Sequence, residues 1–179
     1  MVARNRLPPW HEELRLRDGR ELLVRPVRPD DAGPLREGFA LLQPEEVRQR
    51  FLSPQDELTP GVAERVCRPD PRSEFVLVAA EPLPPGEAVI GAIARAARIG
   101  DGKDAEFSIM VGDFVAGQGL GRHLMRRLVR WARGKRFARL RGDVLADNQP
   151  MLALAESLGF KREDTADDPN LVRVVLELV

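Results

Sequence analysis

The sequence has a single cysteine, Cys67, only two histidines and no tyrosine. One cysteine cannot form a disulfide within the chain, and no Cys or His residues have the spacing of a zinc site. We therefore expect a protein that depends on neither a disulfide nor a metal.

Long apolar runs and an excess of charge are also missing. No stretch approaches the roughly 18 apolar residues that a membrane span needs, and Met1–Trp10 lacks the apolar core of a signal peptide. Lys plus Arg and Asp plus Glu number 28 each, so the total charge favours neither polyanions nor polycations. These absences predict a cytoplasmic protein without a membrane partner.

What remains is the composition of an ordinary globular protein, with 43% hydrophobic and 31% charged residues in 179 positions. That length suits one well-buried core. Residues 1–10, with Pro8 and Pro9, predict a flexible tail. We expect a single domain over residues 11–179.

The first part of the chain predicts a hairpin and three short helices. The hairpin strands flank Asp18-Gly19, a dipeptide suited to a tight turn. Asp30 and Asp31 stand where a helix N-cap is expected. The predicted elements are strands 14–16 and 21–27, a first helix through Leu35, Phe39 and Leu42, and helices 44–51 and 60–67.

The second part alternates strands with two longer helices. Leu120, Leu124 and Leu128 form an apolar stripe at helical spacing. The predicted strands are 75–80, 88–94, 105–111, 140–145 and 171–178, and the helices are 119–133 and the one that Asn148 begins. This order predicts an α/β fold with a mixed, mostly antiparallel sheet and helices on both faces.

The segment 116–122, AGQGLGR, lies between a predicted strand and the 119–133 helix. Glycines let the backbone approach a ligand closely, and the first N–H groups of a helix favour phosphate. A tight glycine turn without a ligand would leave the same pattern. The spacing matches neither G-x-x-x-x-G-K-[ST] nor G-x-G-x-x-G, which disfavours P-loop and Rossmann folds.

The succession of strand, glycine loop, helix, strand and Asn148 before LGF resembles the acetyl-CoA-binding half of the Gcn5-related N-acetyltransferase (GNAT) superfamily, over about residues 20–178. More narrowly, the segments LRDGRELLVRPVRPDDAGPLREGF, LQPEEVRQRF, AEFSIMV and VLADNQPMLALAESLGF are similar to those of bacterial protein lysine acetyltransferases that control acyl-CoA synthetases. The resemblance implies an acetyl-CoA-dependent enzyme that acetylates a protein lysine, with an acyl-CoA synthetase as the candidate acceptor.

The resemblance also assigns the site. Glu106, in AEFSIMV, matches the family's general base, and Asn148 matches an asparagine that bonds the cofactor or the chain around it. Ile109 and Val111 would contact pantetheine, and a backbone N–H near Val111 would polarise the thioester carbonyl. The pyrophosphate N–H groups would come from Gly117, Gln118, Gly119, Leu120, Gly121 and Arg122.

A base is needed because a lysine amine, with a reference pKa of about 10.4, arrives protonated at neutral pH. Asp104 and Asp113 are alternatives to Glu106, which would otherwise be a solvated strand residue. Asn148 would otherwise be a plain helix N-cap.

Two positions depart from the family pattern. Ala116 stands where Gln or Arg usually begins the glycine loop, and Ala155 stands where a tyrosine often protonates the leaving thiolate. Water, or Ser157, would then supply that proton. The departures also leave open a non-catalytic acyl-CoA sensor.

A basic stretch is hidden in the neutral total: nine Lys or Arg and no acidic residue lie between Arg122 and Arg141. Cofactor phosphates or an acidic protein surface fit it better than nucleic acid, since aromatics are few and no DNA-binding fold is visible. A solvated helix face is the simpler explanation. Acetylation of a small amine is a further alternative.

Overall fold

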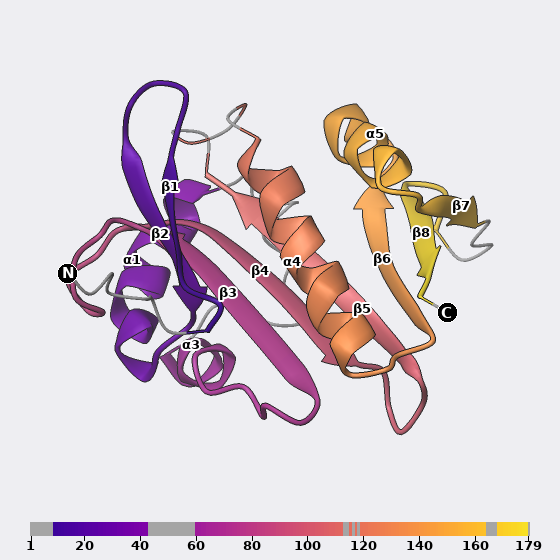
Figure 1. The fold of residues 1–179 in the computed structure, drawn as a ribbon, viewed down its shortest axis with the longest axis horizontal. Helices are drawn as coiled ribbons and strands as arrows, with labels where there is room; N and C mark the ends of the chain where they lie inside the picture. The colour runs from indigo at the N-terminus through magenta and orange to yellow at the C-terminus, as the bar shows by residue number, and fades with distance from the viewer. Residues whose placement is uncertain are drawn as a thin grey trace, which may run out of the picture. The chain divides into compact units, whose positions relative to one another are not determined.

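The computed structural model describes residues 9–42, 60–112, 115, 117, 119–163 and 168–178. These residues form one eight-stranded sheet, in the order β1-β2-β3-β4-β5-β6-β8-β7, and four α-helices (Figure 1). The strands are β1 (Glu12–Arg15), β2 (Glu21–Pro26), β3 (Glu74–Ala80), β4 (Ile90–Arg98), β5 (Asp104–Val111), β6 (Arg139–Leu145), β7 (Lys161–Glu163) and β8 (Leu171–Glu177). The helices are α1 (Ala32–Leu42), α3 (Pro60–Val66), α4 (Leu120–Gly134) and α5 (Gln149–Ser157).

The chain groups into two compact units. The first combines residues up to Pro69 with Val76–Ile93 and Met110–Gln118. Its β1 and β2 pair antiparallel around a turn in which Gly19 has φ 90°, a conformation that favours glycine. Its core is a cluster of aliphatic side chains, from β3, β4, α1 and α3, that includes Leu35, Val78 and Ile93.

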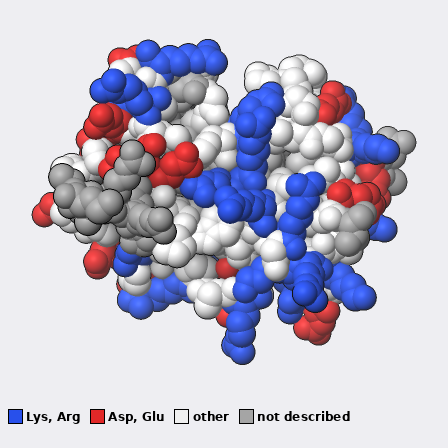
Figure 2. Space-filling model, viewed as in Figure 1, with Lys and Arg blue, Asp and Glu red and all other residues white. Residues whose placement is uncertain are grey.

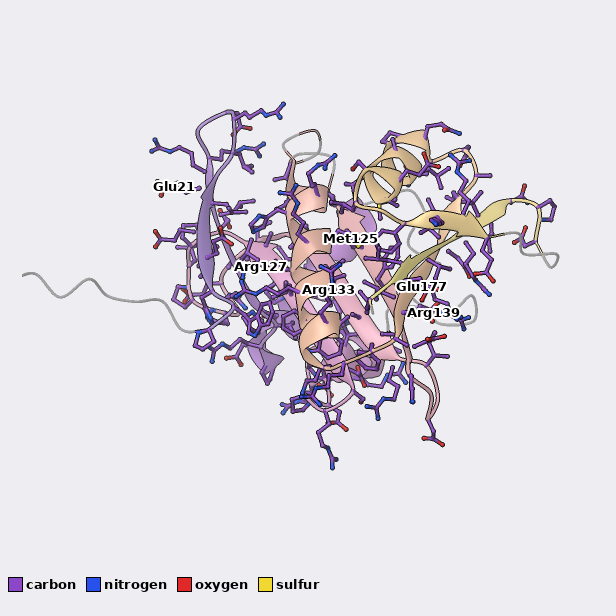
Figure 3. The ribbon with its side chains drawn as sticks, turned by 45° about the vertical axis from the view of Figure 1, so that its right-hand side comes forward. Glu21, Met125, Arg127, Arg133, Arg139 and Glu177 are labelled. Carbon is purple, nitrogen blue, oxygen red and sulfur yellow. The ribbon has the colours of Figure 1, made fainter. Side chains whose placement is uncertain are left out.

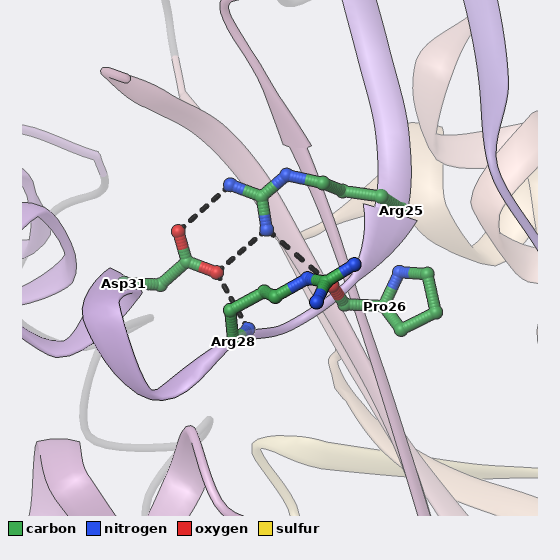
Figure 4. A network of polar contacts seen from close by, with 4 residues as sticks. All are labelled: Arg25, Pro26, Arg28 and Asp31. Carbon is green, nitrogen blue, oxygen red and sulfur yellow. Dashed lines mark hydrogen bonds and ion pairs between the residues drawn. The ribbon is translucent and has the colours of Figure 1, made fainter. Parts of the chain in front are cut away.

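A buried ion pair joins β2 to the start of α1 in this unit (Figure 4). Arg25 donates two hydrogen bonds to the two carboxylate oxygens of Asp31, at 2.7 and 2.8 Å. Asp31 also accepts the backbone N–H of Arg28, at 2.7 Å. The expected N-cap role of Asp31 was therefore wrong: a 3₁₀ turn (Pro29–Asp31) precedes α1, and the carboxylate faces inward to Arg25.

The second unit contains Asp70–Phe75, Ala94–Ile109 and Gly119–Val179. Strands β6 and β8 pair antiparallel over seven residues, and the three residues of β7 extend that pairing. The apolar stripe of α4 is buried, including Leu124 and Leu128, and the opposite face carries arginines. Trp131 of α4 stacks on Phe75, with ring centroids 5.4 Å apart.

Most predicted elements are confirmed to within a few residues. The short strand β7 was not predicted, since KRE has no apolar period, and the predicted helix 44–51 lies outside the described residues. In the described part of the chain, no helix is both long and apolar enough to cross a membrane, and no cluster of His, Cys, Asp and Glu is arranged to hold a metal.

Candidate active site

Strand β5 pairs in parallel with β6 over only three positions, Asp104↔Arg139, Ala105↔Leu140 and Glu106↔Arg141. Beyond that point, from Gly142 to Leu145, β6 continues in register with β8. The edge of β5 from Phe107 to Ile109 is therefore left outside the β5–β6 register. Such an edge offers backbone N–H and C=O groups to a ligand that lies along it as an added strand does.

An aromatic ring packs against β6 next to the point where the β5–β6 register ends. A Cβ added at Gly142 would lie 2.6 Å from ring atoms of Phe107, so the ring lies directly against the β6 backbone. Phe160, which follows α5, meets the Phe107 ring edge-on, with centroids 5.5 Å apart. Only glycine at position 142 leaves room for this packing.

Glu106 stands at the last paired position of β5, and its side chain is exposed, whereas Ala105 and Phe107 on either side are buried. Alternation along a strand puts Glu106 on the sheet face opposite those two residues. The base predicted from the sequence therefore lies on a solvent-accessible face, beside the point where β5 loses its β6 partner.

Charged side chains surround Glu106 on that face. Arg173 of β8 donates a hydrogen bond to Asp143 of β6, at 3.0 Å. This bond, with the negative charges of Asp143, Glu163 and Glu106, raises the pKa of Arg173 above its usual value. Arg173 is thus a fixed positive charge within electrostatic reach of Glu106.

The glycine loop has the backbone geometry that anion binding requires. Gly117 has φ 75° and Gly119 has φ 80°, and a Cβ added at either would meet no atom of the described residues within 4 Å. The backbone conformation at both positions therefore favours glycine. Gly119 is the N-cap of α4 and has no side chain to cap the helix.

The first turn of α4 contains N–H groups that have no partner within the helix. The N–H of His123 makes the first bond of the helix ladder, to the carbonyl of Gly119 at 3.2 Å. The N–H groups of Leu120, Gly121 and Arg122 precede that bond, so helix geometry gives them no partner within α4. Together with the helix dipole they can hold a phosphate. Leu120 is buried, so only its backbone can take part.

Asn148 is the N-cap of α5, and its side-chain oxygen accepts the N–H of Met151 at 3.3 Å. The N-cap interpretation is therefore confirmed, and the amide nitrogen of Asn148 is the end of the side chain that can still donate to a ligand. Ala155, in the family's tyrosine position, is fully buried. Ser157 is exposed, but its hydroxyl donates to the carbonyl of Leu154 at 2.7 Å, which engages the proton it would supply.

The other residues predicted for the site lie in one or the other unit, or outside the described residues. Ile109 is half-buried in the second unit, and Val111, also half-buried, ends β5 in the first. Asp104 lies at the start of β5, opposite Arg139. Asp113, Ala116 and Gln118 lie outside the described residues.

Sequence reasoning missed the charges around Glu106. The segment RLRGDVL has charged residues at alternate positions, a signal for a strand with one exposed face, and LVRVVLE carries Arg173 in an otherwise mostly apolar strand. These segments contain Arg141, Asp143 and Arg173. The sequence pattern does not give the β6–β8 register, which brings Asp143 opposite Arg173.

Comparison with known proteins identifies the family. Residues 21–161 match the family described as Acetyltransferase (GNAT) domain. The acetyltransferase PA5475 of Pseudomonas aeruginosa is 30% identical over 163 residues, covering 91% of this chain and 86% of that protein.

Two solved structures share the fold. The GNAT domain of S. lividans PAT has a TM-score of 0.78 at 24% identity, covering 96% of this chain and 99% of that one. The structure of yncA from Salmonella typhimurium with its cofactor acetyl-CoA has a TM-score of 0.66 at 22% identity, covering 88% and 94%. These matches confirm the predicted GNAT fold, with its mixed, mostly antiparallel sheet. The chain therefore belongs to the GNAT acetyltransferase family and is an N-acetyltransferase that uses acetyl-CoA.

Proposed function

We propose that this enzyme acetylates a lysine side chain on the surface of a protein, with Glu106 as the general base. The observation that carries the proposal is the exposed position of Glu106 at the last β5–β6 pair. A base that stands on an open sheet face suits an acceptor whose own surface excludes water on binding. A small amine is more often held in a concave pocket that buries most of it.

Acetyl-CoA is the cosubstrate of GNAT enzymes, and this chain's residues suit it. The N–H groups of Leu120, Gly121 and Arg122 would hold the pyrophosphate. The edge of β5 at Phe107–Ile109 would pair with the amides of the pantetheine arm. The thioester would then lie near the strand that carries Glu106.

Transfer requires a neutral amine. Glu106 would accept a proton from the lysine ammonium, directly or through one water, and the amine nitrogen would form a bond to the thioester carbon. The carbon–sulfur bond then breaks, the thiolate leaves, and the nitrogen gives its second proton to water as the amide forms. With Ala155 in the tyrosine position and the Ser157 hydroxyl bonded to Leu154, water is the proton source for that thiolate.

The resemblance of AEFSIMV and VLADNQPMLALAESLGF to bacterial protein lysine acetyltransferases supports a protein acceptor, and an acyl-CoA synthetase is the first to test. Acetylation would remove the charge of the target lysine.

The test compares the native enzyme with Glu106→Gln, measuring release of CoA thiol with an acyl-CoA synthetase as acceptor and locating the acetylated lysine by mass spectrometry. Loss of a general base should lower kcat by about 10²–10⁴-fold. Acetyl-CoA binding, measured by calorimetry, should not change, because Gln keeps the size of the side chain.

Asp104→Asn, at the other acidic position of β5, is the matched control and should keep its activity. Equal rates in the native enzyme and Glu106→Gln would remove Glu106 from the mechanism. Acetylation of small amines but of no protein would overturn the protein acceptor.

A further inference from the structure

The exposed side of α4 carries an open pocket of about 370 Å³. Three arginines of α4, Arg126, Arg130 and Arg133, line it together with Val129 and with Leu158, which follows α5. Figure 2 shows Lys and Arg side chains gathered over the part of the surface that α4 occupies in Figure 1. We call these five residues the arginine groove.

Helix geometry explains why the three arginines act together. Residues at i, i+4 and i+7 lie on one face of a helix, so Arg126, Arg130 and Arg133 form a single row. Val129 is only 8% exposed and lies beneath the row, with half-buried Leu158 beside it. The groove therefore has an aliphatic floor and a cationic rim.

Two arginines of this row, Arg126 and Arg133, differ from Arg139 and Arg173 of the same unit. Arg139 pairs with Glu177 at 3.0 Å and Arg173 with Asp143 at 3.0 Å (Figure 3 shows the first pair). Arg126 and Arg133, by contrast, have no ion pair with a carboxylate of the described residues, and α4 contains no acidic side chain. Like charges one turn apart destabilise a helix. An anion seated on the row would relieve that repulsion.

The groove begins about one helical turn beyond the phosphate-binding end of α4, since Arg126 follows Arg122 by four residues, about 6 Å along the axis, and its centre lies farther along. Arg130 follows Leu120 by ten residues, which is about 15 Å along the helix axis, whereas the free N–H groups lie in the first turn. The row from Arg126 to Arg133 is about 10 Å long. An extended peptide covers that length with about three residues.

We propose that the arginine groove binds an acidic segment of the acceptor protein. Two or three Asp or Glu side chains of that segment would contact the arginines of the rim, and one apolar side chain would contact the floor. The proposal rests on the protein acceptor proposed above. The floor favours a peptide over nucleic acid, because Val129 and Leu158 offer no aromatic ring on which a base can stack. Docking of this kind speeds encounter and selects the partner by charge.

The test is Arg126→Glu with Arg133→Glu in the full chain, assayed with an acyl-CoA synthetase and with a short peptide that contains the unmodified target lysine of that synthetase. For the protein acceptor we expect KM to rise tenfold or more and to lose most of its dependence on salt. The values of kcat and of KM for acetyl-CoA should stay the same, as should the kinetics with the peptide.

The matched control, Arg15→Glu with Arg17→Glu, makes the same charge change in the exposed β1–β2 hairpin and should leave all these values unchanged. Arg126→Gln with Arg133→Gln removes the charge without reversing it and should give an intermediate KM. If the variant with two Glu substitutions does not fold, the variant with two Gln substitutions provides the test.

Three results would overturn the docking proposal while leaving protein acetylation intact. One is an unchanged KM for the protein acceptor. Another is a raised KM for acetyl-CoA, which would make the groove part of the cosubstrate site. The third is salt-dependent binding of a single-stranded oligonucleotide that disappears in the variant while protein acetylation persists. If the native enzyme acetylates no protein, the proposed function fails as well.

Discussion

Two arginine–aspartate pairs lie in different surroundings. In the first unit, the side chains of Arg25 and Asp31 are 3% and 0% exposed. In the second, those of Arg173 and Asp143 are each 31% exposed. Both pairs join an arginine guanidinium to an aspartate carboxylate, but only the first pair is buried. The comparison teaches that burial decides whether such a pair constrains the fold or places a charge beside a site.

The buried pair has lost its hydration and must satisfy its polar atoms within the protein. It nearly does so: Arg25 uses both terminal nitrogens and Asp31 both oxygens. Among buried side-chain atoms of the described residues, the Arg25 Nε is left without a partner. Removing one member of such a pair leaves an uncompensated buried charge. The exposed pair keeps water as a substitute.

The largest effect should come from breaking the buried pair. Asp31→Asn keeps the shape of the side chain but leaves the Arg25 guanidinium buried without its counter-charge. We expect the free energy of unfolding to fall by about 3–5 kcal/mol, as measured by urea denaturation monitored by Trp fluorescence.

A second variant sharpens the result. Arg25→Met with Asp31→Leu removes both charges, so it should recover much of the loss, although Leu at position 31 leaves the Arg28 N–H without its acceptor. A loss below about 1 kcal/mol in Asp31→Asn, the size expected of an exposed pair, would mean that burial does not separate the two pairs.

The middle effect is a dependence of stability on alkaline pH, set by Cys67, a buried residue of the first unit's core that lies within electrostatic reach of Asp31 and Arg25. Burial first, and then the charge of Asp31, raises the pKa of the Cys67 thiol from 9.0 to about 12. Between these values the unfolded chain loses the thiol proton while the folded chain keeps it. The free energy of unfolding should therefore fall as pH rises from 9.0 to about 12, and show no such effect below.

Cys67→Ala removes that titration, so its stability should fall less steeply over the same pH range in parallel urea titrations. Comparing slopes avoids the constant offset from the smaller side chain. Identical slopes for the two proteins would show that the folded thiol ionises as it does in the unfolded chain.

The smallest effect should come from the exposed pair. Asp143→Asn should lower the free energy of unfolding by no more than about 1 kcal/mol. Without Asp143 the Arg173 guanidinium is free to turn toward Glu106, so acetyl transfer should slow by less than about fivefold, the equivalent of about 1 kcal/mol. A loss as deep as that of Glu106→Gln would make Asp143 part of the machinery.

Sequence patterns predicted the elements whose signals are local. The Asp18-Gly19 hairpin, the stripe of α4 and the Asn148 cap each follow from a few neighbouring residues, and each is observed. The glycine loop was also readable, since positive φ at Gly117 and Gly119 requires residues of that type.

Features that depend on distant residues were not predicted. The Arg25–Asp31 pair looked like a strand residue and a helix cap, because nothing local signals that two charges will be buried together. The β5–β6 register ends at Glu106, next to the contact between the Phe107 ring and Gly142, residues 35 positions apart in the sequence. A pattern read along the chain cannot give such a register.

The short β5–β6 register also bears on how the enzyme responds to metabolism. A ligand that pairs with the edge of β5 adds hydrogen bonds to the native sheet and none to the unfolded chain, so it raises the free energy of unfolding by an amount that grows with the logarithm of its concentration. Acetyl-CoA would then be a component of the sheet as well as a reactant. Free CoA carries the same pantetheine arm and pyrophosphate, so the lifetime of the enzyme against proteolysis and heat would follow the combined supply of CoA and acetyl-CoA.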